Sequence, residues 1–150
     1  MAMNDYCVFT LRQRRFALPL AAVRETVDAL SHVPVPWAPP CLLGLVQLRG
    51  QIFPQVELSG FLGALPPGRV ASPQYLVVEA AALRFIAPVD RIDIRLLSTE
   101  TAVPHPGASL HPALDATLQP EGAEEKIELI HVDRLRCALA RELRFAELAA

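Results

Sequence analysis

Lysine is nearly absent from this 150-residue chain, in which Lys126 is the only lysine among fourteen basic residues. Sixteen acidic residues outnumber the basic ones, so the formal net charge is −2. This balance argues against a general nucleic-acid binder, which needs a basic surface. The remaining basic residues are arginines, whose planar guanidinium groups suit directional contacts with carboxylates.

Cysteine is scarce, and Cys7, Cys41 and Cys137 form no Cys-x-x-Cys motif. Redox and metal motifs of that type are therefore missing, and a reducing compartment fits the sequence. His105 and His111 are separated by five residues, with no cysteine nearby, and this spacing matches no common metal-ligand pattern. We therefore expect neither a metal ion nor another cofactor.

No apolar run reaches the length of about eighteen residues that a membrane-spanning helix needs, and the first residues lack a signal-peptide pattern. The sequence also contains no nucleophile elbow, phosphate-binding loop or dinucleotide fingerprint. These absences predict a cytoplasmic, non-catalytic protein without direct membrane insertion. A hydrophobic content of 52% over this length predicts one folded domain.

The most informative segment is 42–58, in which every even position is apolar or small and most later odd positions are polar. Period-two alternation of this kind predicts half-buried strands whose even positions face the core. The alternation keeps its parity through the turn, which requires a three-residue loop, 49–51. In such a loop Gly50 takes a positive φ, and the side chain of Arg49 projects into solvent.

Other parts of the chain also alternate, and they predict an all-β fold of the barrel or sandwich class. One helical turn is predicted at 21–25, and a proline-rich loop at 101–122 with a short strand near 113–118. From residue 132 the apolar period becomes helical, and Asp133 is placed to cap an amphipathic C-terminal helix. Further strands are predicted at 7–11 and 16–20, as a hairpin, and at 27–33, 75–79, 83–89, 92–96 and 127–131.

Four prolines lie around Trp37 between residues 34 and 40, which predicts a loop. This tryptophan has two possible roles. It either anchors an interface, where tryptophan is enriched, or covers the end of the first barrel.

Residues 44–50 read Gly-Leu-Val-Gln-Leu-Arg-Gly, and Pro54 is followed by Val-Glu-Leu at 56–58. This pattern resembles the signature of the CheW-like family, which are bacterial chemotaxis adaptors. Family members usually have asparagine at the place of Gln47 and aspartate at the place of Glu57. The segments 16–25, 89–92 and 127–135 are also similar to family segments, whereas 101–123 is not.

The resemblance implies a fold of two intertwined five-stranded SH3-like barrels packed around a shared apolar interface. In this interpretation residues 1–150 form a single CheW-like domain. The first lobe spans about 6–63 and the second about 70–131. The C-terminal helix, about 132–148, then packs back on the barrels.

The resemblance also implies a function as a scaffold without catalysis. Family members couple the cytoplasmic tips of methyl-accepting chemoreceptors to a CheA-type histidine kinase and bind the CheW-like regulatory domain of that kinase. The strand containing Pro88 departs from the family pattern, because the glycine expected before Val89 is missing. The alternative is therefore a divergent small-barrel module that binds a peptide or regulator outside a chemoreceptor array.

Five residues are candidates for partner binding in this interpretation, and each also has a simpler one. Arg49 is the leading candidate, or else a solvated turn residue. Gly50 is more readily explained by turn geometry than by direct contact. Gln47 either lies near the same surface or fills the polar side of a strand. Glu25 either contacts a partner or is simply solvated. Val23 either binds a partner or belongs to the core.

Overall fold

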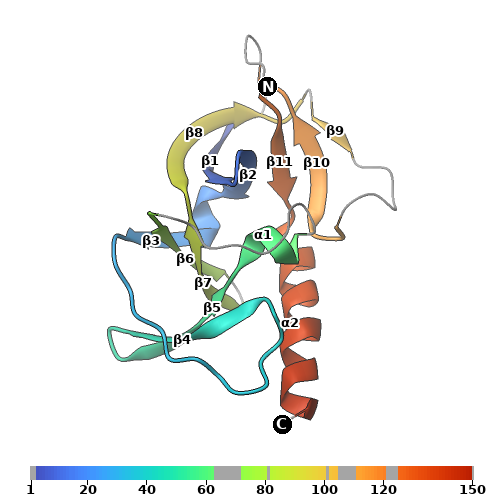
Figure 1. The fold of residues 1–150 in the computed structure, drawn as a ribbon. Helices are drawn as coiled ribbons and strands as arrows, with labels where there is room; N and C mark the ends of the chain where they lie inside the picture. Colours follow the sequence, from blue (N-terminus) through green and yellow to red (C-terminus); the bar gives the residue numbers. More distant parts are fainter. Residues whose placement is uncertain are drawn as a thin grey trace.

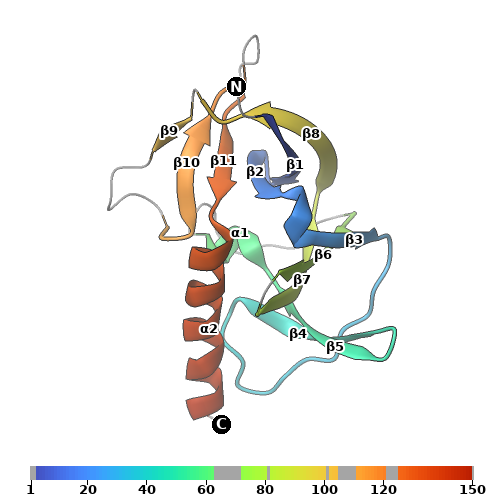
Figure 2. The same ribbon diagram turned by 180° about the vertical axis from the view of Figure 1, so that it is seen from behind.

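The structure is a computed structural model that describes residues 3–62, 72–80, 82–100, 102–104, 111–120 and 125–149, with side chains as far as Leu143. Most of these residues lie in two β-sheets, one above the other in Figure 1. A long C-terminal helix descends from the upper sheet and runs beside the lower one, as Figure 2 shows from behind. This arrangement confirms the predicted all-β class with a C-terminal helix.

The first sheet has six strands in the order β8-β1-β2-β11-β10-β9. Neighbouring strands are antiparallel except β2 and β11, which are parallel. The strands are β1 (Met3–Leu11), β2 (Arg14–Pro19), β8 (Arg91–Ser98), β9 (Val103–Pro104), β10 (Leu114–Leu118) and β11 (Ile127–Ile130).

The second sheet has five strands in the order β3-β6-β7-β5-β4. Its parallel pair, β5 and β7, meets at Gln55 and Ile86. A short 3-10 helix η1 (Leu20–Ala22) leads into this sheet, and helix α1 (Leu58–Phe61) follows β5. The strands are β3 (Val23–Val27), β4 (Leu42–Leu48), β5 (Gln51–Val56), β6 (Gln74–Ala80) and β7 (Leu83–Val89).

Each sheet combines strands from both halves of the chain. The strands β1 and β2 belong to the expected first lobe, yet they pair with β8 and β11 of the expected second lobe. In this sense the two lobes are intertwined, as the resemblance implies. The first sheet reaches six strands because the two-residue strand β9 pairs with the edge of β10.

A shared apolar core fills the space between the two sheets. Phe9 of β1 and Phe85 of β7 are buried in it from opposite sheets. Leu135 and Leu139 enter the same core from helix α2 (Val132–Ala149). The helix therefore packs back on the sheets through its apolar stripe, as its periodicity predicts.

Each sheet also buries a smaller apolar cluster on its other face. Val8 of β1 belongs to the cluster of the six-stranded sheet, and Val77 of β6 to that of the five-stranded sheet. Because Leu76 and Val78 face the shared core, three consecutive residues of β6 are fully buried. Strands that are buried on both faces appear in the sequence as continuous apolar runs, without alternation.

The β4–β5 hairpin turns in two residues, Arg49 and Gly50, because Leu48 pairs directly with Gln51. Both turn residues have positive φ, 49° and 77°, as a type I′ turn requires. The predicted three-residue loop is therefore wrong. Type I′ turns usually have asparagine, aspartate or glycine before the glycine, so an arginine there gave no signal for the shorter turn.

The two-residue turn reverses the parity of the inward-facing positions between β4 and β5. Val46 of β4 is buried as predicted. In β5, however, Phe53 is the buried residue, whereas Ile52 is 61% exposed. The predicted inward face is thus right for β4 and wrong for the start of β5, because a one-residue change in register exchanges the two faces of a strand.

The chain between β2 and β4 also differs from the prediction. The helical turn predicted at 21–25 overlaps η1 only at residues 21 and 22, and the strand predicted at 27–33 is wrong, because β3 ends at Val27. β3 lies four residues earlier than the predicted strand, because its pairing with β6 begins at Val23. Trp37 is 86% exposed, so it does not cover a barrel.

The proline-rich segment contains two short strands, where one was predicted. The predicted strand near 113–118 is β10, and β9 pairs with it through Val103 and Pro104. Residues 101, 105–110 and 121–124 lie outside the described residues, so the expected long loop is described only in part.

The cap of α2 is His131, because its Nδ1 atom accepts the backbone N–H of Arg134 at 3.2 Å. Asp133 instead accepts hydrogen bonds from the guanidinium group of Arg136, at 2.9 and 3.2 Å. The expected capping by Asp133 is therefore wrong. Within the described part of the chain, no helix is long and apolar enough to cross a membrane.

Gly44 allows the segment before β4 to lie against the sheet. A Cβ atom on this residue would be 2.5 Å from the carbonyl oxygen of Val33. That carbonyl accepts the N–H of Leu45 at 2.9 Å, and the N–H of Val33 donates back to Leu45 at 2.8 Å. The carbonyl cannot move away without loss of this bridge, so the position requires glycine.

Val46→Asp tests the inward face of β4. The substitution places a charge among buried apolar side chains, so we expect the free energy of unfolding to fall by about 3 kcal/mol or more. Gln47→Asp is the matched control at the adjacent exposed position and should change it by less than about 0.5 kcal/mol. Urea unfolding measures both variants. Equal loss in the two would show that residue 46 does not face the interior.

The two glycines of this hairpin should respond differently to substitution. Gly44→Ala creates the clash with Val33 and should cost about 1–3 kcal/mol of stability. Gly50 has open space around its missing Cβ, so Gly50→Ala should cost only about 1 kcal/mol, from its positive φ. Gly50→Asn should be close to wild type, since asparagine tolerates that backbone. A Gly44→Ala variant with wild-type melting would contradict the close approach.

Candidate partner-binding site

The turn of the β4–β5 hairpin reaches the opposite edge of the five-stranded sheet. Arg49 Nη1 donates a hydrogen bond to Glu25 Oε2 of β3 and forms an ion pair with it. Because β3 and β4 are the two edge strands, the sheet curls until the hairpin turn meets β3. The side chain of Arg49 remains 64% exposed, whereas that of Glu25 is only 20% exposed. A mostly covered carboxylate thus holds the guanidinium group at the surface.

The backbone at this turn is unfavourable for an arginine. A non-glycine residue in the left-handed region costs about 1–2 kcal/mol, and Arg49 has a φ of 49°. Gly50 adopts its positive φ without such a cost. Unfavourable backbone conformations cluster at functional sites, which makes the guanidinium group a candidate for contact with another molecule.

Arg24 extends the pair along the edge of the sheet. Its Nη1 atom donates hydrogen bonds to Gln51 Oε1 at 3.1 Å and to Glu79 Oε2 at 3.0 Å. Its Nε atom lies 3.9 Å from Glu25 Oε2. Arg24 therefore connects the hairpin, β3 and β6 through one guanidinium group.

Arg84 of β7 ends this series of charges. Its Nε atom is 4.0 Å from Glu79 Oε2, and its guanidinium carbon lies 5.4 Å from the centroid of the Phe53 ring. Three guanidinium groups thus share two carboxylates, which leaves one positive charge in excess. We call this set the arginine row; it consists of Arg49, Glu25, Arg24, Glu79 and Arg84.

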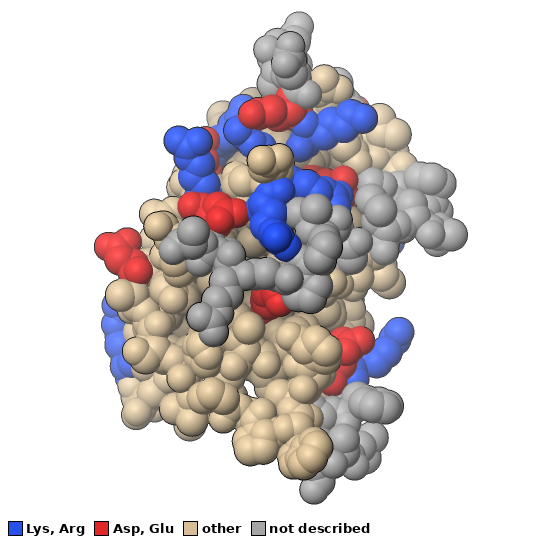
Figure 3. Space-filling model, in the orientation of Figure 1, with Lys and Arg blue, Asp and Glu red and all other residues tan. Residues whose placement is uncertain are grey.

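A second surface lies on the outward side of the same hairpin. Val33 pairs with Leu45, and Gln47 pairs with Ile52, so the four side chains share one face. Val33 is 70% exposed and Ile52 is 61% exposed. We call these four residues the outer hairpin face. In Figure 3 the charged side chains gather over the upper part of the molecule, whereas the area below them is largely uncharged.

The two buried thiol groups are not suited to nucleophilic chemistry. Cys7 and Cys41 are buried, and burial raises the pKa of each thiol to about 11, with smaller contributions from nearby carboxylates. Both thiols are therefore protonated at neutral pH, and the thiolate is the reactive form.

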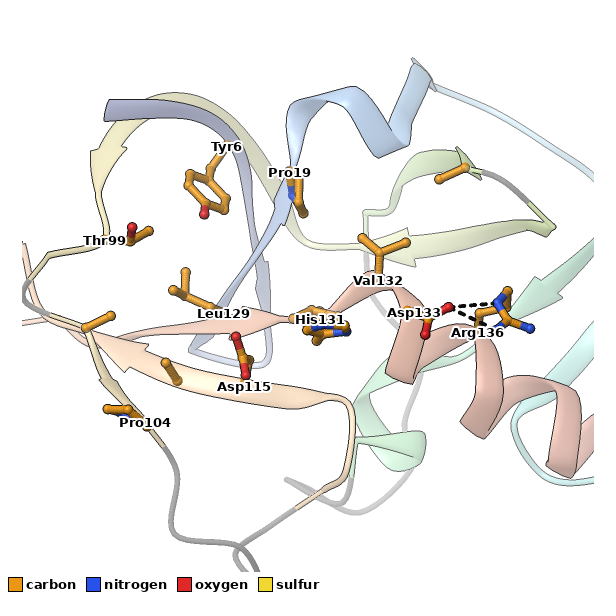
Figure 4. A pocket seen from close by; sticks show the side chains of 14 residues that line it. Tyr6, Pro19, Thr99, Pro104, Asp115, Leu129, His131, Val132, Asp133 and Arg136 are labelled. Carbon is orange, nitrogen blue, oxygen red and sulfur yellow. Dashed lines mark hydrogen bonds and ion pairs between the residues drawn. The ribbon is translucent and has the colours of Figure 1, made fainter. Parts of the chain in front are cut away.

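A cavity of about 670 Å³ opens between the six-stranded sheet and the start of α2 (Figure 4). Tyr6, Asp115 and His131 contribute polar groups to its wall. Burial and the nearby carboxylate of Asp115 raise the pKa of Tyr6, so its hydroxyl stays protonated at neutral pH. His131 caps α2, and Asp133 is bonded to Arg136. Two polar residues of the wall, His131 and Asp133, are thus engaged in contacts within the chain.

No group of three or more metal-ligating side chains is placed to bind an ion within the residues that the structure describes. His105 lies outside those residues. His111 accepts the backbone N–H of Ala113 through Nδ1 at 3.0 Å, and its ring lies 4.8 Å from that of Phe61. Burial lowers the pKa of His111, which favours the neutral ring in this packed position.

Comparison with known proteins identifies the fold family. The sequence model described as the CheW-like domain matches residues 5–135. The chain belongs to the CheW-like domain family. This result confirms the resemblance that residues 44–58 indicate.

Two CheW proteins illustrate how far the similarity extends. A Helicobacter pylori protein named chemotaxis protein CheW is 30% identical over 71 residues, which are 47% of this chain and 43% of that protein. The match therefore spans less than half of the relative's length. The crystal structure of the scaffolding protein TtCheW from Thermoanaerobacter tengcongensis has a TM-score of 0.75 and 21% identity. The structural match covers 87% of this chain and 90% of TtCheW, and it shows that the two have the same fold.

The structure brings together three of the five residues that the family resemblance implies. Arg49, Gly50 and Glu25 meet at the hairpin turn. Gln47 is exposed two residues earlier, on the outer hairpin face. Val23 is half-buried and packs against the shared core, in agreement with its simpler interpretation.

No local sequence pattern indicates the other residues of the arginine row or the exposure of Ile52. Arg24 is adjacent to a predicted site residue, but its partner Glu79 is 55 positions away. Only the pairing of β3 with β6 brings the two strands together. A three-residue turn would place Ile52 in the interior, and the observed two-residue turn places it at the surface.

Proposed function

We propose that this CheW-like protein is a non-catalytic adaptor that couples the signalling tips of chemoreceptors to a CheA-type histidine kinase. The observation that carries the proposal is the exposed guanidinium group of Arg49, fixed at a tight turn by Glu25. An arginine that is already ordered loses little conformational freedom when it binds a carboxylate. Family membership supports the same function.

An adaptor needs at least two separate binding surfaces, and the hairpin provides two kinds. The turn presents charge, whereas the outer hairpin face presents exposed apolar side chains. Adaptor contacts can be individually weak, because several contacts in one assembly raise the effective concentration. One rigid hairpin is thus suited to hold two partners close together.

The proposed location is the cytoplasm, with recruitment to receptor arrays through the partners. Direct binding to nucleic acid or insertion into a membrane forms no part of this function. A second candidate is a peptide- or regulator-binding module outside such arrays, which the sequence departures around Pro88 favour. A receptor and a kinase of this type encoded beside the chain would favour the first function.

Arg49→Asn is the most direct test of the role of the hairpin turn. Asparagine suits a positive φ, so the variant should fold and melt like the wild type while it lacks the guanidinium group. We expect capture by receptor tips and kinase to weaken about tenfold in co-sedimentation. Arg49→Ala and Arg49→Glu should weaken capture at least as much, with some loss of stability from the backbone.

A charge exchange separates partner contact from internal structure. The double variant Arg49→Glu with Glu25→Arg can re-form the ion pair with the charges reversed. It should therefore fold, yet capture should remain weak, because the partner meets a carboxylate where it needs a cation. Restored capture would show that Arg49 acts only by joining the turn to β3 and would remove it from the binding surface.

The outer hairpin face has its own test. Ile52→Asp should leave melting within about 0.5 kcal/mol of wild type, since the side chain is mostly exposed. Capture of at least one partner should fall, because a charge would then be buried in an apolar contact. Val103→Asp is the matched control, at a residue 66% exposed on β9. Equal effects of the two variants would contradict a role for this face.

A further inference from the structure

The cations of the arginine row are more accessible than its anions. The side chains of Arg49, Arg84 and Arg24 are 64%, 45% and 38% exposed. Those of Glu25 and Glu79 are 20% and 36% exposed. The surface that another molecule meets is therefore cationic, although the formal net charge of the whole chain is −2.

Several donors of the row have no acceptor among the residues that the structure describes. Each guanidinium group has five N–H donors. Arg49 donates one hydrogen bond, to Glu25, and the contact of Arg84 with Glu79 is an ion pair at 4.0 Å without a hydrogen bond. Free donors on a planar guanidinium group match the two oxygens of a carboxylate.

The arrangement favours an acidic protein segment over a nucleic acid. A phosphate backbone presents closely and regularly spaced negative charges, whereas the three guanidinium groups of the row are separated by two carboxylates. Acidic side chains spaced along a peptide can instead meet the individual guanidinium groups. Arg24 occupies the middle of the row, since it contacts both Glu25 and Glu79.

We propose that the arginine row is a docking site for a segment of a protein partner that carries several Asp or Glu side chains. Arg24 and Arg84, which no sequence pattern singled out, then bind the partner together with Arg49. This inference rests on the proposed function, because it names the chemistry by which an adaptor would recognise one of its partners.

Fluorescence anisotropy with a labelled peptide that alternates glutamate and alanine tests the proposal on the full chain. We expect weak binding that decreases with added salt, because the contacts are exposed ion pairs. Arg84→Gln and Arg24→Gln should each weaken the affinity about two- to fivefold. Thermal melting checks both variants, and Arg84→Gln decides the test if loss of Arg24 perturbs the sheet.

The matched control is Arg134→Gln, at an arginine 54% exposed and paired with Asp115 at 3.4 Å, outside the row. It should leave the affinity unchanged, and a peptide of alternating glutamine and alanine should not bind. The proposal is overturned by equal weakening in Arg134→Gln, by binding of the glutamine peptide, or by unchanged affinity in Arg84→Gln. Tighter, row-dependent binding of a single-stranded oligonucleotide would also overturn it.

The docking site and the proposed function can be rejected independently of each other. If the peptide does not bind, while receptor tips and kinase are still captured, the adaptor function stands and the acidic docking site is rejected. If the peptide binds through the row, while neither receptor tips nor kinase are captured, the docking site stands and the adaptor function is rejected.

Discussion

The two-residue turn at Arg49 and Gly50 is the constraint on which the rest of the binding region depends. Positive φ at both residues fixes the register of β4 against β5. That register sends Phe53 into the core and Ile52 to the surface. A turn one residue longer would exchange these two faces and move the arginine away from Glu25. One local backbone conformation therefore determines the core, the outer hairpin face and the exposed cation together.

Burial on both faces of the central strands gives this region a stable base. The strands β1, β6 and β7 contribute side chains to the shared core and also to the cluster of their own sheet. Most side chains of these strands are thus occupied by internal packing, and Arg84 of β7 is an exposed exception. The groups that we propose for partner binding lie on β3, on the β4–β5 hairpin, and at Glu79 and Arg84, where β6 and β7 pair beside them. Exposed binding groups on a rigid frame lose little entropy when a partner binds.

The sequence predicted the class of fold, most of the strands and the C-terminal helix, because alternation and helical period report directly on burial. It failed where a non-local or backbone effect decided the outcome. The register of β5 depended on a turn with an unusual residue, Arg49. The exposure of Trp37 depended on the path of a loop. The arginine row depended on strand pairing that brings Arg24 and Glu79 together across 55 positions. Such contacts have no signal in local sequence.

The central claim is that a partner contacts the hairpin turn and the adjacent edge of β3. Hydrogen–deuterium exchange of the full chain, alone and in an assembly reconstituted with receptor tips and kinase, tests it most directly. The account predicts slower exchange at residues 47–52 and in β3 on assembly, with little change in the buried strands β6 and β7. Slower exchange confined to β9, β10 and α2, with the hairpin turn unchanged, would contradict it.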